Sequence, residues 1–229
     1  MRRLLVVPVL LLAACGRERP EEQPARPTPE LVAELTSAVD VALRWRPEPG
    51  AAGQVVEYAN EPGGAYTALE FAPPHRNSYE HLDLIPRTSF HYRVRSFHGP
   101  ASEPAGVTLP PGDEVPESDG HGWAEPVRGP SGTRPVRSAD AAPADFRAEV
   151  RHANGILFTW TDRAAGEEGY LVEVRPAGAA DFTVAAQLDP DVRSFGLITL
   201  PEEKTATYRV RPYYYGTTTN TAHQRTGGP

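Results

Sequence analysis

The chain has 229 residues, of which 39% are hydrophobic and 23% charged, so it holds enough apolar material for one or two small cores but not for one large core. Its net charge is −7, and an acidic chain without a basic cluster is a poor nucleic-acid binder, so we expect no nucleic-acid partner. The single cysteine excludes an intramolecular disulfide, and stability must come from core packing and ladder hydrogen bonds.

The chain begins with a segment typical of secretion. Residues 1–14 combine two arginines with a short apolar run that is too short to span a bilayer as a helix. Leu12-Ala13-Ala14-Cys15 resembles the lipobox of bacterial lipoproteins. The resemblance implies that Cys15 becomes the mature N-terminus and is acylated, which anchors the protein to a membrane of the cell envelope. Gly16, in place of Asp, favours the outer membrane by the enteric rule of that family. A plain signal peptide with an incidental cysteine is the alternative.

Two proline-rich stretches separate the remaining parts. Residues 15–29 are charged and contain four of the 25 prolines, so we expect a disordered tether that reaches roughly 40 Å in a polyproline-like form. Residues 110–143 contain seven prolines and no alternating apolar pattern, which indicates a long linker between two domains. Trp123 is the large apolar side chain of this linker, and either binds a ligand, docks on a neighbouring domain or stays exposed.

The first predicted domain, residues 30–109, shows short runs with period-two alternation. Val39, Val41, Leu43 and Trp45 alternate with smaller or polar residues, as in a half-buried strand. Turn signals such as Pro62-Gly63-Gly64 separate the runs, which favours an antiparallel sandwich. The expected strands are residues 39–45, 54–58, 66–71, 78–84, 90–97 and 107–109.

The second predicted domain, residues 144–229, repeats the pattern. Tyr-Arg-Val-Arg occurs at residues 92–95 and again at 208–211, each time about 47 residues after a strand that ends in a tryptophan, Trp45 or Trp160. A shared spacing indicates one domain type used twice. The expected strands are residues 156–160, 169–175, 182–188, 194–198, 207–215 and, more weakly, 222–226.

Several motifs of both halves resemble bacterial fibronectin type III modules. In the second half these are Trp160-Thr161-Asp162, Glu167–Val174, Leu200-Pro201 and Tyr208–Arg211; the first half matches through Trp45, residues 56–58 and 84–90, and Tyr92–Arg95. The resemblance implies an all-β protein of two antiparallel, immunoglobulin-like sandwiches with Trp45, Tyr92, Trp160 and Tyr208 in the cores. The family places a tyrosine near the start of strand F, where this chain has Phe90 and Ala206. We therefore expect each corner to lose one hydrogen bond, a net loss of about 0.5–1.5 kcal/mol.

Alternation along the two Tyr-Arg-Val-Arg strands predicts which side chains leave the cores. Cross-strand ion pairs are expected between Glu57 and Arg93 or Arg95, and between Glu173 and Arg209 or Arg211, all of them exposed. Phe97, Tyr213 and Tyr215 also point outward. Such aromatics either bind a protein or glycan partner or cover the packing surface between the domains.

No motif of the sequence predicts catalysis. The chain lacks a nucleophile elbow, a phosphate loop and spaced metal ligands, so we expect no enzyme activity, no cofactor and no metal. Asp162 and Glu167 bracket a loop where the resemblance implies turn capping and loop tethering. The sequence thus favours a lipid-anchored envelope protein that acts as a non-catalytic binding or spacer module, with an unknown envelope protein or polysaccharide as partner. The alternatives are a structural subunit of a secretion or pilus-associated assembly, and an accessory of glycan-processing enzymes.

Overall fold

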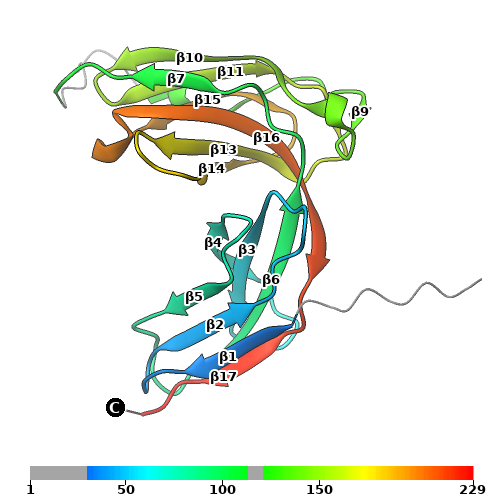
Figure 1. Ribbon diagram of the computed structural model, residues 1–229, viewed down its shortest axis with the longest axis vertical. Coiled ribbons are helices and arrows are strands. Elements are labelled where there is room, and N and C mark those ends of the chain that lie inside the picture. The colour runs from blue at the N-terminus through cyan, green and yellow to red at the C-terminus, as the bar shows by residue number, and fades with distance from the viewer. Residues whose placement is uncertain (1–29, 113–120, 229) are drawn as a thin grey trace, which may run out of the picture.

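The computed structural model describes residues 30–112 and 121–228, which form two antiparallel β-sandwiches (Figure 1). The predicted signal segment, Cys15 and the predicted tether lie outside the described residues. Within the described ranges, no helix is long and apolar enough to cross a membrane. The all-β fold class expected from the sequence is confirmed.

The first sandwich packs a three-stranded sheet against a larger one. The smaller sheet has the order β1-β2-β5, and alternate residues of β2 are buried because its other face meets solvent. The core joins both sheets, with Trp45 from one and Tyr92 from the other. The strands are β1 (Leu31–Leu35), β2 (Val41–Trp45), β3 (Gly53–Ala59), β4 (Thr67–Ala72), β5 (Ser78–His81) and β6 (Ser89–His98).

The second sandwich repeats this plan. Its outer sheet has the order β10-β11-β15-β8, and its core joins Trp160 to Tyr208 across the two sheets. The main strands are β10 (Ala144–His152), β11 (Gly155–Thr161), β13 (Gly169–Pro176), β14 (Thr183–Leu188), β15 (Val192–Ile198) and β16 (Thr205–Thr218). Sequence alternation did not predict β1 or β10, the first strand of each sandwich.

The two sandwiches exchange their last strands. β7 (Ala105–Thr108) follows β6 in the chain, yet it pairs with β16 of the second sandwich, where Ala105 lies opposite Tyr208. β17 (Ala222–Arg225) follows β16, yet it pairs with β6 of the first sandwich, where Ala222 lies opposite Tyr92. The assignment of residues 107–109 to the first domain and of 222–226 to the second is therefore wrong.

Two local features produce the exchange. β16 runs for 14 residues, so its end passes out of the second sandwich and pairs with the end of β6, where Tyr215 lies opposite Phe97 (Figure 1). Directly after β6, the chain crosses β16 at Gly99, whose φ is +143°. A Cβ at Gly99 would lie 1.9 Å from the carbonyl oxygen of Pro212, so only glycine fits this crossing. One sheet consequently runs through both sandwiches in the order β14-β13-β16-β6-β3-β4.

Residues 121–143 of the predicted linker pack on the second sandwich. β8 (Val127–Arg128) extends the outer sheet beside β15, and β9 (Arg134–Pro135) pairs in parallel with β12 (Ala164–Ala165). Val136 and Ala141 form a small core with Ala164. The described ranges also contain three short 3-10 helices, η1 (His121–Ala124), η2 (Ala139–Ala141) and η3 (Pro201–Glu203). This segment is therefore a part of the second sandwich rather than a free linker.

The expected loss of a corner hydrogen bond is wrong for the second sandwich. β16 begins so that Tyr208, two residues beyond Ala206, reaches the corner, and its hydroxyl donates a long hydrogen bond of 3.4 Å to the carbonyl of Glu203. In the first sandwich the hydroxyl of Tyr92 instead lies 3.1 Å from Nδ1 of His81 on the facing sheet. Both tyrosines are fully buried.

Candidate functional site

The aromatic residues considered for partner binding divide into buried and half-buried groups. Phe97 and Tyr213 are each 2% exposed and form one cluster with Leu171, so the interpretation of these two as an open binding face is wrong. The pairing of β6 with β16 places these side chains on one face of the continuous sheet, and Phe71 contacts both rings edge-on at centroid distances of 5.8 and 6.5 Å. They therefore cover the packing surface between the sandwiches, which was the second of the two interpretations.

Tyr215 and Trp123 remain half-buried. The ring of Tyr215 lies 3.4 Å from the guanidinium carbon of Arg95 and contacts Tyr213 edge-on. Trp123 lies against β15, where a Cβ at Gly196 would come within 2.5 Å of the indole, and its ring meets that of His152 edge-on at 5.5 Å. Trp123 thus docks on the second sandwich.

Both predicted ion pairs are present, and each glutamate takes two arginines. Glu57 accepts from Nε of Arg93 at 2.7 Å and from Nε of Arg95 at 2.8 Å. Glu173 accepts from Arg209 and, at 3.0 Å, from Nε of Arg211.

The expected exposure of these ion pairs is wrong, since each glutamate is only 3% exposed. Aromatic rings cover the arginines: the guanidinium carbon of Arg93 lies 3.9 Å from the ring centre of Tyr66, and that of Arg209 lies 3.9 Å from that of Phe182. Buried pairs of this kind are costly to break, because removing one partner leaves a buried charge without compensation.

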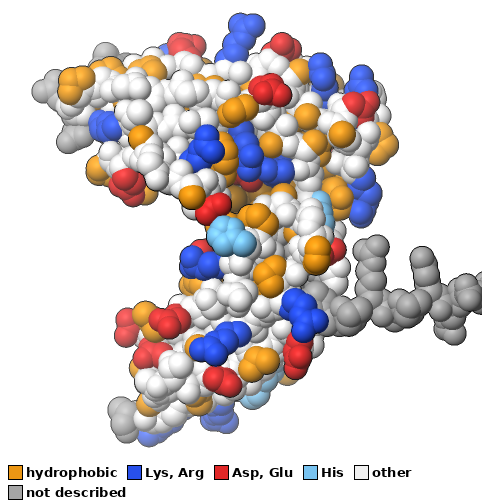
Figure 2. Space-filling view, viewed as in Figure 1, with side chains coloured by type: hydrophobic (Ala, Val, Ile, Leu, Met, Phe, Trp, Pro, Cys, Tyr) orange, Lys and Arg blue, Asp and Glu red, His pale blue; other side chains and the backbone are white. Residues whose placement is uncertain are grey.

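The surface is hollowed where the two sandwiches meet (Figure 2). The hollow encloses about 160 Å³ and is lined by Phe71, Pro73 and Pro74 from the first sandwich and by Asp181, Phe182 and Arg209 from the second. Ligand pockets for drug-sized molecules measure roughly 300–1,000 Å³, so this hollow admits little more than one side chain. An exposed pair, His75 Nε2 with Asp181 at 3.6 Å, spans its rim.

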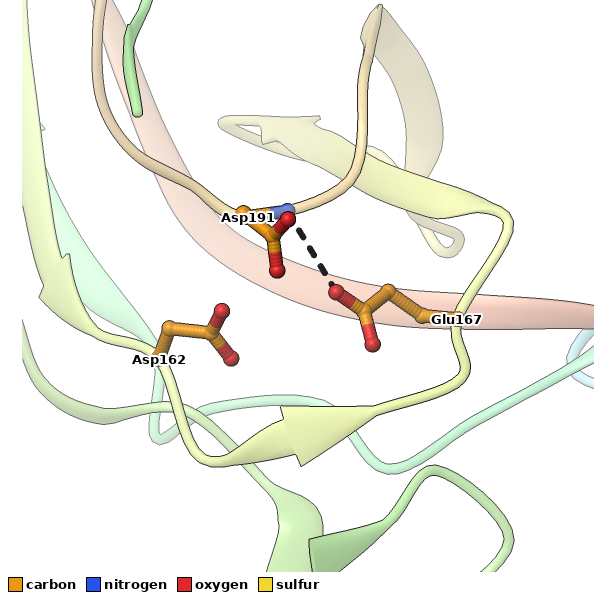
Figure 3. Close-up of side chains that lie close together, drawn as sticks. All are labelled: Asp162, Glu167 and Asp191. Atoms are coloured by element: carbon orange, nitrogen blue, oxygen red, sulfur yellow. Dashed lines mark hydrogen bonds between the residues drawn. The ribbon is translucent and has the colours of Figure 1, made fainter. Parts of the chain in front are cut away.

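Three carboxylates gather at one end of the second sandwich (Figure 3). Asp162 follows β11, Glu167 precedes β13, and Asp191 lies in the turn between β14 and β15. Each offers an oxygen, and these oxygens all lie within 4.8 Å of one another. The sequence linked Asp162 with Glu167, but it gave no signal for Asp191, which lies 24 residues further along the chain.

One oxygen of each of the first two carboxylates is held by the loops. Oδ1 of Asp162 accepts from the Ala164 backbone N–H at 2.8 Å and from the hydroxyl of Tyr170. Oε1 of Glu167 accepts from the Asp191 backbone N–H at 3.3 Å (Figure 3). These bonds are the turn capping and loop tethering that the family resemblance implied.

The second oxygens lack partners. Oδ2 of Asp162 and Oε2 of Glu167 are buried, and neither has a hydrogen-bond partner in the described structure. Burial raises the pKa of the Glu167 carboxyl, and the negative charges of Asp162 and Asp191 raise this pKa further. A raised carboxyl pKa beside two other acids means that the cluster favours either a bound proton or a bound cation.

The comparisons with known proteins find similarity among solved structures. No protein-family model matches the sequence, and no curated protein matches it. A two-domain fibronectin type III segment of chicken tenascin is 13% identical, with a TM-score of 0.28; the match covers 88% of this chain and 99% of that one. The FN1–FN3 domains of chicken CNTN1 are 18% identical, also with a TM-score of 0.28, over 88% of this chain and 66% of that one.

Proposed function

We propose that this protein is a lipid-anchored, non-catalytic module of the bacterial cell envelope, which holds its second sandwich as a spacer or binding unit at a fixed orientation to its first. The exchange of β7 and β17 is the observation that supports the fixed orientation. A hinge between two sandwiches needs one covalent connection that is free to bend. Here the chain crosses between the sandwiches along paired strands, and the β6–β16 ladder continues one sheet from one sandwich into the other.

The placement of β1 supports an anchor close to the first sandwich. The backbone N–H of Leu31 donates to Oδ1 of Asn220 at 2.7 Å, and Gln224 donates to the carbonyl of Ala33 at 2.6 Å, so the first described strand is tied down beside β17. Residues 15–29 then connect Cys15, which we propose is acylated, to the first sandwich, and we propose the outer membrane as the membrane that holds the anchor.

The buried junction aromatics and the small hollow beside them favour a spacer over a ligand pocket at the junction between the sandwiches. A protein or polysaccharide partner in the envelope would accordingly contact an outer surface of the second sandwich. Capture of crosslinked envelope components with the intact protein tests whether a partner contacts this surface.

The rigidity is tested by spin-label distances. Cys15 is the only cysteine, so Cys15→Ser gives a background in which Leu35→Cys and Ile198→Cys, both at exposed positions, label one sandwich each. We expect a single narrow distance distribution. A broad distribution with intact sandwiches would refute the fixed orientation.

The anchor is tested separately in living cells. Metabolic labelling with a fatty acid should mark the native chain, and globomycin should block its processing. Cys15→Ser should abolish the label, and persistence of the label in this variant would refute the anchor.

A further inference from the structure

We propose that Asp162, Glu167 and Asp191 form a calcium-binding site at the end of the second sandwich. This inference does not depend on the membrane anchor. It rests on the convergence of three carboxylates from three loops and on the buried oxygens that they leave without partners.

The orphan oxygens are the observation that points to a cation. Glu167 is 9% exposed, and its Oε2 is buried without a partner, as is Oδ2 of Asp162. A buried carboxylate oxygen without a donor is costly, so such groups are normally paired or coordinate a metal. The opposite oxygens are held by backbone N–H groups and by Tyr170. The three carboxylate groups face a common space at the end of the sandwich (Figure 3).

Two of the other buried glutamates have cationic partners, whereas Glu203, 7% exposed, accepts from the backbone N–H of Leu200. Glu57 and Glu173 are each 3% exposed, and each binds two arginines. Among the described residues, no arginine hydrogen bonds to the three carboxylates of the cluster. The charge that arginine supplies at Glu57 and Glu173 is therefore supplied by something else at Glu167, either a proton or a metal ion.

The donor set favours calcium among the common metals. All three donors are carboxylate oxygens, which suit hard cations and not zinc, whose protein sites draw on cysteine and histidine. Calcium binds oxygen at about 2.3–2.6 Å, so donors on opposite sides of the ion lie up to about 5 Å apart, which the 4.8 Å limit of the cluster satisfies. Magnesium requires about 2.0–2.1 Å in a strict octahedron and keeps most of its water. Asp162 and Asp191 are half-buried, which leaves one side of the site open for water to complete the coordination.

A bound ion would join three segments that otherwise meet through few bonds. These are the turn after β11, the residues before β13 and the turn before β15. With three protein carboxylates we expect an affinity in the range of extracellular calcium modules, Kd about 0.1–1 mM.

The experiment is a calcium titration of the full chain carrying Cys15→Ser, after treatment with a chelator. At about 10 mM Ca²⁺ we expect the Tm to rise by about 3–10 °C, with saturable heat in calorimetry and a much smaller response to Mg²⁺. Glu167→Gln keeps the shape of the side chain and removes one ligand charge. We expect this variant to bind calcium at least tenfold more weakly. Its metal-free Tm should equal that of the parent or rise, because repulsion between the like charges of the cluster falls.

Asp189→Asn is the matched control. Asp189 lies in the same turn as Asp191 but is paired with Arg128 at the surface, outside the cluster. This variant should keep the full response. The proposal would be overturned if Glu167→Gln responded to calcium as strongly as the parent. It would also be overturned if the parent gave no response and carboxyl NMR detected a proton on Glu167 at neutral pH, which would leave a shared proton as the role of the cluster.

Discussion

Thr226 offers a direct test of the strand exchange. Its side chain is 3% exposed, and its hydroxyl donates to the carbonyl of Ile85 at 2.6 Å and accepts from the Thr88 backbone N–H at 2.9 Å. Thr226→Val keeps the volume and removes both hydrogen bonds. At about 0.5–1.5 kcal/mol for each bond, the free energy of unfolding should fall by about 1–3 kcal/mol. For a chain of this size that loss lowers the Tm by about 2–12 °C.

The assay must locate the loss as well as measure it. Urea unfolding gives the magnitude, and hydrogen exchange read by mass spectrometry gives the place. Protection should fall in residues 85–95 of the first sandwich, although Thr88 lies 138 positions away from Thr226 along the chain, and not in residues 155–175 of the second. Thr218→Val makes the same substitution at an exposed side chain and should change stability by less than about 0.5 kcal/mol. A loss of protection confined to the second sandwich would refute the exchange.

Three further outcomes follow from the same structure. Phe97→Ala should lower the free energy of unfolding by about 3–5 kcal/mol, because the ring is buried between the sandwiches. Tryptophan fluorescence from both sandwiches should report one shared unfolding transition, and two separate transitions in the native chain would contradict a shared junction. Glu57→Gln should cost about 3 kcal/mol, since two arginines lose their charged partner, whereas the exposed Glu80→Gln should be neutral, and equal effects in urea melts would count against the buried cluster. A protease site placed between residues 112 and 121 should yield fragments that still elute together in gel filtration, because each fragment carries a strand of the other's sandwich; separation without denaturant would rule this out.

The repeat and the alternation were enough to predict the sandwich class, and the family resemblance implied the core residues. Trp45, Trp160, Tyr92 and Tyr208 are buried because a period of two fixes which face of a strand meets the core. The ion pairs were predictable for the same reason, since a glutamate and two arginines at alternate positions share one face of neighbouring strands.

Alternation could not predict which sandwich a strand would join. The strands at 105–108 and 222–225 are both four residues long, so their sequences do not distinguish the two sandwiches. Their exchange depends on the close approach of Gly99 to Pro212 and on the unbroken length of β16. The burial of Phe97 and Tyr213 follows from that exchange and was missed with it. Asp191 was missed because a turn residue carries no periodic signal, and its position beside Glu167 is a result of the sheet packing.

Strand exchange also orders the events of biosynthesis. The ladder of the first sandwich is incomplete until residues 222–225 emerge, after every strand of the second sandwich has been made. Contacts between residues so distant in sequence form slowly, because the entropy cost of closing a long loop comes before the favourable energy of the contacts. This late closing strand therefore keeps the leading half from completing its fold for as long as translation continues.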